Sequence, residues 1–319
     1  MNIASLGEFG LIRKISRLTA KSKDVILGIG DDTAAVVPTS LRNLLLLTCD
    51  SVIENIHFDT KATPFQIGRK AMARNLSDIA AMGGTPRYAL VAAALPSTLS
   101  EKSALGIYKG LEAIARKYKT RIIGGDTSRS RAGIHLSVTI IGEVPRNELL
   151  SRRGARVGDI ACVTGTLGGS IHGKHLFFEP LIAEGRFLAQ RFHPTSMMDV
   201  SDGLASDLQR LREQSGVGFE IFGDMLPVSP ALKSRKLSRS HEIAHAMQDG
   251  EDYELLFTIP KHRLPALQKA WKKRFRLPLT PIGVVRNKRF GIQIRTAGKK
   301  RSISAANDHF ASIQDEANP

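Results

Sequence analysis

Short apolar segments of strand length alternate with longer segments of helical apolar spacing along most of the chain. Strands are predicted at 25–30, 43–50, 87–96, 121–125, 134–144, 160–165, 196–201, 253–260 and 279–286. Helices are predicted at 6–18, 63–84, 101–118, from the glycine-rich turn 165–170 to about 192, and at 202–216. Such alternation is typical of a mixed α/β fold in which helices cover sheets.

The polar, charged segment 145–159 separates one completed set of strands and helices from the next. Its composition is that of a domain boundary. With 319 residues, 42% of them hydrophobic, the chain has enough apolar side chains for two cores. We therefore predict two αβ domains, 1–147 and 148–319.

The formal charge of +16 raises the possibility of a nucleic-acid partner. The excess is spread, with 20 basic and 13 acidic residues in 1–150 and 26 and 17 in the remainder. The basic runs 272–276 and 298–301 lack the interleaved aromatic residues of a single-strand binding surface. No nucleic-acid partner is expected, and a basic nucleic-acid-binding protein without catalysis stays open as an alternative.

Cys49 and Cys162 are far apart in the sequence and give no disulfide framework, which favours a reducing compartment. No segment has the length of uninterrupted apolar sequence that a signal peptide or a membrane span requires. A cytoplasmic protein without a membrane partner is therefore expected.

Several acidic stretches of this basic chain exclude Lys and Arg. Residues 193–209 contain Asp199, Asp202 and Asp207 without a Lys or Arg. We expect these carboxylates to be balanced by bound metal rather than by neighbouring basic side chains. A structural alternative for Asp202 is that it caps the helix that follows.

Other aspartates fall where side chains can face a shared crevice. Asp50, Asp126 and Asp199 come at or just past the ends of predicted strands, whereas Asp78 lies on the inward side of an apolar helix. Carboxylates gathered in this way raise each other's pKa unless a cation neutralises them. For Asp32 in "GIGDD", a turn role is the alternative.

The ligand types favour Mg²⁺ over Zn²⁺, because the candidate set consists of oxygen ligands only. The glycine-rich turns "GIGDD", "GGD" and "GTLGG" permit close backbone approach, and their amides are candidates for binding phosphate oxygens. The chain has neither a Walker A pattern nor a kinase signature set.

The segments "GEFGLI", "GIGDD", "NIHF", "RKAMARNLSDIAAMGGTP", "IIGGDTS", "TGTLGG", "MDVSDGLASDL" and "GEDYELLFT" together resemble the thiamine-monophosphate kinase family. The resemblance runs in the same order from Gly7 to Phe310. It implies a two-domain aminoimidazole ribonucleotide synthetase-like (PurM-like) architecture, with an N-terminal αβ domain that dimerises through its sheet. It also implies transfer of the γ-phosphoryl group of ATP to thiamine monophosphate, with several Mg²⁺ ions, in a homodimer.

The resemblance also implies roles for individual residues. The implied metal ligands are Asp32, Thr48, Cys49, Asp50, Asp78, Asp126, Asp199 and Asp202. The implied ATP contacts are Tyr108, Gly125, Asp126, Arg152 and Ser201. His57, Glu251 and Asn307 are implied at the acceptor, and Asp78, Asp126 and Arg152 are implied in catalysis.

Some positions depart from the family's pattern. Cys49 stands where the family has a serine, so this position offers the metal a thiol or only a backbone carbonyl. Asn307 stands where the family has an aromatic residue that packs on the substrate. Gly169 occupies a position where an Asp is common. Because these changes affect the acceptor pocket, another ATP-using enzyme of the same superfamily with a different acceptor stays open. Selenophosphate synthetase is disfavoured, since residues 1–30 contain no cysteine.

Overall fold

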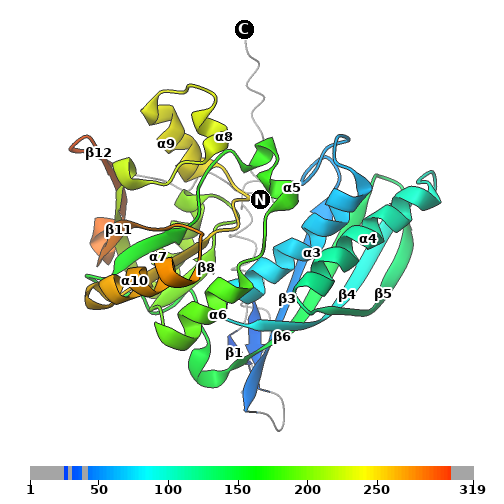
Figure 1. Ribbon diagram of the computed structural model, residues 1–319, viewed down its shortest axis with the longest axis horizontal. Helices are drawn as coiled ribbons and strands as arrows, with labels where there is room; N and C mark the ends of the chain where they lie inside the picture. The colour runs from blue at the N-terminus through cyan, green and yellow to red at the C-terminus, as the bar shows by residue number, and fades with distance from the viewer. Residues whose placement is uncertain (1–24, 28–30, 38–41, 303–319) are drawn as a thin grey trace, which may run out of the picture.

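The computed structural model describes residues 25–27, 31–37 and 42–302. The helix expected at 6–18, the turn at 28–30 and Asn307 lie outside the described residues. Two mixed sheets, each with its own helices, form the protein (Figure 1). Among the described helices, none is long and apolar enough to cross a membrane.

The first sheet has six strands in the order β1-β2-β3-β6-β4-β5. Its elements are β1 (Val25–Leu27), β2 (Ala34–Val36), β3 (Asn43–Ile53), α3 (Pro64–Ala81), β4 (Thr85–Pro96), α4 (Glu101–Lys117), β5 (Arg121–Ser130) and β6 (His135–Pro145). Its pairs are antiparallel except β4 and β5, which α4 connects. A short 3-10 turn, η1 (Arg146–Glu148), follows.

The second sheet has seven strands in the order β13-β12-β9-β11-β7-β10-β8. Its strands are β7 (Ile160–Thr164), β8 (Ser196–Asp199), β9 (Val217–Phe222), β10 (Leu255–Ile259), β11 (Leu279–Asn287), β12 (Ile292–Thr296) and β13 (Lys299–Ser302). Its helices are α5 (Lys174–Phe177), α6 (Ile182–Arg191), α7 (Leu204–Ser215), α8 (Pro230–Lys233), α9 (Arg239–Gln248) and α10 (Leu264–Arg274). Short 3-10 turns are η2 (Ser170–His172), η3 (Gly223–Met225), η4 (Lys261–Arg263) and η5 (Lys288–Phe290).

Helix α3 begins where the Thr-Pro signal predicts. The Thr63 hydroxyl accepts a hydrogen bond from the Gln66 amide, and the Gln66 side chain caps the Thr63 amide in return, with Pro64 in the first turn. Thirteen of the 18 residues of α3 are buried. Because so little of this helix meets solvent, its polar side chains need partners inside the protein.

Helix α3 lies beside α4 on one face of the first sheet, with α5 and α6 on its other side (Figure 1). Glycines permit these close contacts. A Cβ atom at Gly68 would lie 1.9 Å from the Ile107 carbonyl oxygen, and one at Gly185 would lie 2.1 Å from that of Ala80. Helix α3 is therefore shared by both halves of the molecule, and its side chains can reach residues of either half.

Several predicted elements differ from the structure. The helical stretch expected up to residue 192 is broken between α5 and α6, because Pro180 removes a backbone donor where a continuous helix would need one. The sequence did not predict strands β2, β9, β12 and β13 or helices α8, α9 and α10. The expected boundary at 147/148 falls between β6 and β7.

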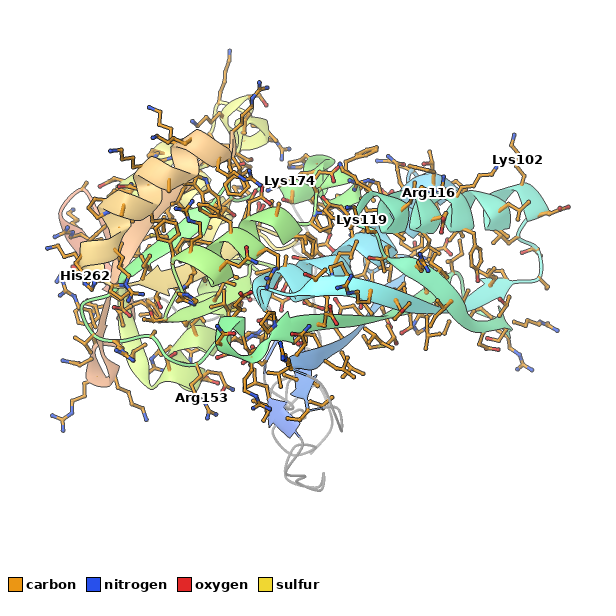
Figure 2. All side chains as sticks on the ribbon, turned by 60° about the horizontal axis from the view of Figure 1, so that its bottom comes forward. Lys102, Arg116, Lys119, Arg153, Lys174 and His262 are labelled. Carbon is orange, nitrogen blue, oxygen red and sulfur yellow. The ribbon has the colours of Figure 1, made fainter. Side chains whose placement is uncertain are left out.

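Basic side chains are spread over the molecule. Figure 2 shows Lys102 on α4 at one end, His262 near the other end, and Arg153 on a third part of the surface. This distribution agrees with the sequence expectation that the positive charge is not concentrated in one patch.

Candidate active site

Three carboxylates from distant parts of the chain meet between the two sheets. One oxygen each of Asp32, Asp78 and Asp199 all lie within 4.8 Å of one another. Asp32 precedes β2, Asp78 lies in α3, and Asp199 ends β8. The convergence of these three predicted metal ligands is therefore a property of the tertiary structure.

Neighbouring hydroxyls hold two of these carboxylates in place. The Thr48 hydroxyl on β3 donates a hydrogen bond of 2.5 Å to Asp78 Oδ2. The Ser77 hydroxyl donates one of 2.5 Å to Asp199 Oδ2. Each carboxylate keeps its second oxygen for another partner. Thr48, a predicted metal residue, thus supports Asp78 through its side chain.

Burial and mutual repulsion act on this cluster. Burial, followed by the charges of Asp50, Asp199 and Asp32, raises the pKa of Asp78 well above its ordinary value. Burial, followed by the charge of Asp32, raises the pKa of Asp199 to about 7. Gathering these acids is unfavourable without a cation, and oxygen ligands with this charge suit Mg²⁺.

Arg152 supplies a fixed positive charge at one side of the cluster. Its Nη2 lies 2.7 Å from Asp32 Oδ1, and its Nε donates to Asp32 Oδ2 at 3.1 Å. Its backbone amide lies 3.3 Å from both carboxylate oxygens of Asp31. Two parallel bonds between a guanidinium and a carboxylate fix both groups. The expected charge of Arg152 is therefore next to the carboxylates.

Asp50 lies beside the cluster rather than in it. Its Oδ2 is 3.3 Å from the Nε of Arg74, and its amide donates to the Asn75 side chain at 2.8 Å. The sequence placed Asp50 at the last residue of its strand, but β3 continues to Ile53. Pairing with β6 along all eleven residues of β3 carries the strand through this polar stretch.

Asp126 also lies inside a strand, because β5 runs on to Ser130 along β4. It is exposed, and it is not one of the three clustered carboxylates found among the described residues. Gly125 has a φ of 150°, and a Cβ there would lie 1.8 Å from the Val91 carbonyl oxygen, so the glycine is needed for strand pairing. The Tyr108 hydroxyl lies 3.5 Å from that of Thr127.

Cys49 directs its thiol to the sheet face opposite Thr48, since side chains alternate along a strand. Its Sγ lies 3.3 Å from the Ser137 hydroxyl, and the residue is exposed. The structure therefore does not bring the thiol to the carboxylate cluster, and only the backbone carbonyl remains for the predicted metal role.

The negative charge of the acidic stretch 193–209 is balanced in part by Arg210, whereas the sequence predicted that bound metal would balance it. This arginine, on α7, forms ion pairs with Asp202 and, at 2.8 Å, with Asp207. Asp202 is not the cap of α7, which is Gly203, and it is not one of the three clustered carboxylates. The basic partner stands one residue beyond the stretch, within reach because α7 brings residues three apart to one face.

A second charged group surrounds Glu251. Lys70 Nζ lies 2.7 Å from Glu251 Oε2 and also donates to the His57 carbonyl oxygen, and His175 Nδ1 is 3.1 Å from the same Glu251 oxygen. Burial alone would raise the pKa of Glu251, but hydrogen bonds from His175 and Lys70 and the charge of Lys70 lower it to about 2. Burial lowers the pKa of Lys70 to about 8.

The sequence reasoning named His57 and Glu251 but missed Lys70 and His175. A signal was present for Lys70, which stands eight residues before Asp78 and therefore on about the same face of α3. The His57 side chain accepts a hydrogen bond from the Ile53 amide at 3.1 Å, so it also shapes its own turn. The carbonyl oxygen of Ser201 accepts a hydrogen bond from the Glu251 amide at 2.7 Å, so the Ser201 backbone contacts the group around Glu251.

The sequence suggested that amides of the glycine-rich turn 165–170 bind phosphate oxygens, but two of these amides bind carboxylates of the protein. The Gly168 amide donates to Asp252 at 2.8 Å, and the Gly169 amide donates to Asp249 at 2.7 Å. Both amides are thus satisfied within the protein, where the sequence suggested phosphate binding. The turn fixes the 249–254 segment instead, and that segment includes Glu251.

Two family models match the chain: AIR synthase related protein, N-terminal domain, over residues 30–144, and its C-terminal domain over residues 151–295. The thiamine-monophosphate kinase of Bacillus subtilis is 35% identical over 307 residues, covering 89% of this chain and 92% of the relative. That of Aquifex aeolicus is 38% identical over 285 residues, covering 82% and 89%.

The chain belongs to the thiamine-monophosphate kinase family.

Solved structures agree with this family membership. A structure described as AaThiL complexed with AMPPCP and TMP has a TM-score of 0.83 at 34% identity and covers 97% of this chain and 99% of its own. A thiamine-monophosphate kinase from Stenotrophomonas maltophilia has a TM-score of 0.74 at 34% identity, covering 90% and 96%. The hydrogenase maturation protein HypE in complex with ATP, at 20% identity and a TM-score of 0.70, shares the fold.

Proposed function

We propose that this protein transfers the γ-phosphoryl group of ATP to thiamine monophosphate and releases thiamine diphosphate and ADP. The observation that carries the proposal is the convergence of Asp32, Asp78 and Asp199 in a member of the thiamine-monophosphate kinase family. The AMPPCP and TMP named for a relative that matches 97% of the chain support both substrates.

The proposed reaction asks for positioning and charge neutralisation more than for proton transfer. The acceptor is a phosphate monoester that is already anionic at neutral pH, so no strong general base is needed. An acceptor phosphate oxygen attacks the γ-phosphorus in line, and the bond from that phosphorus to the bridging oxygen of ADP breaks. The charge of Arg152, held rigidly by Asp32, helps two polyanions approach.

The cluster residues fit magnesium, because three buried or half-buried carboxylates repel one another and offer only oxygen ligands. Asp32, Asp78 and Asp199 would hold it, with Asp50 adjacent. Magnesium bound there neutralises phosphate charge and polarises the phosphoryl group that is transferred. Thr48 and Ser77 keep the carboxylates oriented. Further ions at Asp126 and Asp202, and ATP contacts from Tyr108, Gly125 and Ser201, are part of this proposal.

A homodimer formed through the first sheet is also proposed. Tyr88, Leu90 and Ile123 are exposed by 44%, 40% and 57% on β4 and β5, while α3 and α4 cover the opposite face. Contiguous apolar side chains on a sheet surface favour an interface. A cytoplasmic location is supported by Cys49 and Cys162, which are both free thiols.

One assay tests the function. The purified protein is incubated with Mg-ATP and, separately, thiamine monophosphate, thiamine or aminoimidazole ribonucleotide precursors, and the phosphorylated product is identified. We expect thiamine diphosphate from thiamine monophosphate alone. Phosphorylation of another acceptor, without thiamine diphosphate, would assign the chain to a different ATP enzyme of the superfamily.

A second experiment tests whether the phosphoryl group passes directly from ATP to the acceptor, without a phosphoenzyme. After reaction with γ-labelled ATP and an acid quench, the protein should carry no label, because the phosphoryl group passes directly between the substrates. A stoichiometric labelled phosphate on the denatured protein would establish a phosphoenzyme instead.

A further inference from the structure

Arg74 stands in α3 midway between two charged groups of the site. Lys70 precedes it by four residues and Asp78 follows it by four, so all three lie along one face over roughly 12 Å of helix. Lys70 is bound to Glu251, and Asp78 belongs to the carboxylate cluster. Arg74 is therefore placed between the Glu251 group and the cluster.

The surroundings of Arg74 leave part of its guanidinium without a hydrogen-bond partner. Its side chain is 12% exposed, and Nη1 donates to the Ser51 carbonyl oxygen at 3.2 Å. Its Nε lies 3.3 Å from Asp50 Oδ2 but makes no hydrogen bond to any described residue, although it is buried. A buried donor without a partner costs free energy, which a ligand oxygen recovers when it binds.

Tyr253 presents a second such donor in the same region. Its hydroxyl is buried and has no hydrogen-bond partner among residues 25–27, 31–37 and 42–302. Its ring stacks on Phe178, with centroids 3.9 Å apart and an interplanar angle of 13°, so the phenol is held in place. Tyr253 follows Glu251, the partner of Lys70, by two residues, and its amide donates to the carbonyl oxygen of Val200, the residue after Asp199, at 2.8 Å.

We propose that Arg74 and Tyr253 donate hydrogen bonds to the phosphate of the acceptor, and that Arg74 determines the preference for a phosphorylated over an unphosphorylated acceptor. This inference rests on the proposed function, whose acceptor is a phosphate monoester. A planar guanidinium matches two phosphate oxygens. A phosphate held there lies one helical turn from Asp78, beside the site of phosphoryl transfer.

The alternative role, a contact with the ATP phosphates, is less compatible with the arrangement. Arg152 already stands at the Asp32 side of the cluster, bound through two nitrogens. Arg74 lies toward Glu251, the residue that the family resemblance assigns to the acceptor. Asp50, its ion-pair partner, has a side chain that is 38% exposed, so the pair opens onto solvent where a ligand enters.

Binding measurements on Arg74→Met and Arg74→Lys test the inference. Affinities for thiamine monophosphate and for thiamine are measured by calorimetry with Mg²⁺ and a non-hydrolysable ATP analogue present. For Arg74→Met we expect about tenfold to hundredfold weaker binding of the monophosphate, with thiamine binding unchanged. Arg74→Lys should recover part of the lost affinity for thiamine monophosphate. Tyr253→Phe should weaken the binding of thiamine monophosphate by up to about tenfold.

The control is Arg116→Gln on α4, which breaks only an exposed pair with Glu112 and should leave all affinities unchanged. Equal weakening of monophosphate and thiamine by Arg74→Met, or weakening of the ATP analogue alone, would overturn the inference. Circular dichroism of each variant checks folding, and Tyr253→Phe keeps the test valid if Arg74→Met does not fold.

A further experiment distinguishes failure of the proposed function from failure of the proposed phosphate contact at Arg74. If the wild-type protein makes no thiamine diphosphate, that function falls, and inorganic phosphate becomes the probe for Arg74. Phosphate should then raise the melting temperature of the wild-type and Arg116→Gln proteins but not of Arg74→Met. Equal stabilisation of all three would refute a phosphate site at Arg74.

Discussion

The Ser77 hydroxyl donates a hydrogen bond of 2.5 Å to the carboxylate of Asp199, which lies 122 residues later in the chain. Ser77 belongs to α3, packed on the first sheet, and Asp199 ends β8 of the second. This bond joins the two halves of the protein at the carboxylate cluster. It fixes one oxygen of the Asp199 carboxylate, whose side chain lies close to those of Asp32 and Asp78.

Replacing Ser77 by Ala should lower stability and raise the Mg²⁺ concentration that activity requires. The buried Asp199 carboxylate loses its donor, so we expect a destabilisation of about 1–3 kcal/mol without metal and a several-fold higher Mg²⁺ concentration for half-maximal activity. Urea unfolding and a magnesium titration measure the two effects. Ser103→Ala on α4 is the control, and an unchanged magnesium dependence in Ser77→Ala would show that the bond only joins the two halves.

Asp78→Asn should separate activity from stability. Because burial and the charges of Asp50, Asp199 and Asp32 raise the pKa of Asp78, removing its charge relieves repulsion. We expect the metal-free variant to be at least as stable as the wild type, yet to lose activity by at least about a hundredfold. The rise in melting temperature with Mg²⁺ should also disappear. Asp59→Asn, at an exposed position, should behave as the wild type in all three measurements.

Glu251→Gln should leave the buried Lys70 ammonium without its counter-charge, at a cost of about 3 kcal/mol at pH 7. The folded-state pKa of Glu251, about 2, lies below its ordinary value of 4.5. The stabilisation is therefore fully present above pH 4.5 and is lost as the pH falls toward 2. Urea unfolding of both proteins between pH 7 and pH 3 should show their difference narrowing below pH 4.5.

The exposed Glu112→Gln serves as the matched control, with no pH-dependent difference of this size expected. A constant gap between wild type and Glu251→Gln down to pH 3 would contradict the assigned ion pair.

Gly125→Ala should disrupt the edge of the first sheet. A Cβ at this position would overlap the Val91 carbonyl oxygen on β4, and the φ of 150° is unfavourable for alanine. We expect a loss of at least about 2 kcal/mol and faster hydrogen exchange of the β4–β5 amides. Gly124→Ala, where the atom nearest to an added Cβ is a Leu90 side-chain carbon at 3.5 Å, should cost less. Equal stability of Gly125→Ala and wild type would contradict this strand pairing.

Charges on the exposed sheet face should prevent self-association. The double variant Leu90→Asp and Ile123→Asp places carboxylates at two exposed apolar positions, where a dimer interface would bury them. Analytical ultracentrifugation should give a dimer for the wild type and a monomer for the variant, with the fold retained by circular dichroism. Aspartates at Leu105 and Val157, exposed elsewhere, should leave the dimer intact.

Local sequence signals were sufficient for the elements whose formation depends on neighbouring residues. The Thr-Pro start and apolar spacing predicted α3, and the structure confirms it with a capping box at Thr63 and Gln66. The unusual position of Asp78 on the inward side of this helix indicated a site, and its carboxylate lies in the cluster. These features rest on contacts within one or two helical turns, which are visible in the sequence itself.

Long-range pairing decided the remainder. Whether β3 and β5 continue past Asp50 and Asp126 depends on β6 and β4, so the sequence placed both aspartates at strand ends that do not exist. The Lys70–Glu251 pair joins residues 181 positions apart, and no local pattern specifies it. Local sequence patterns predict many of the helices and strands and identify the acidic residues available for chemistry. Tertiary packing sets which carboxylates share one site and which also pair with an arginine, because a charge buried by that packing must be balanced by whatever group lies next to it in space.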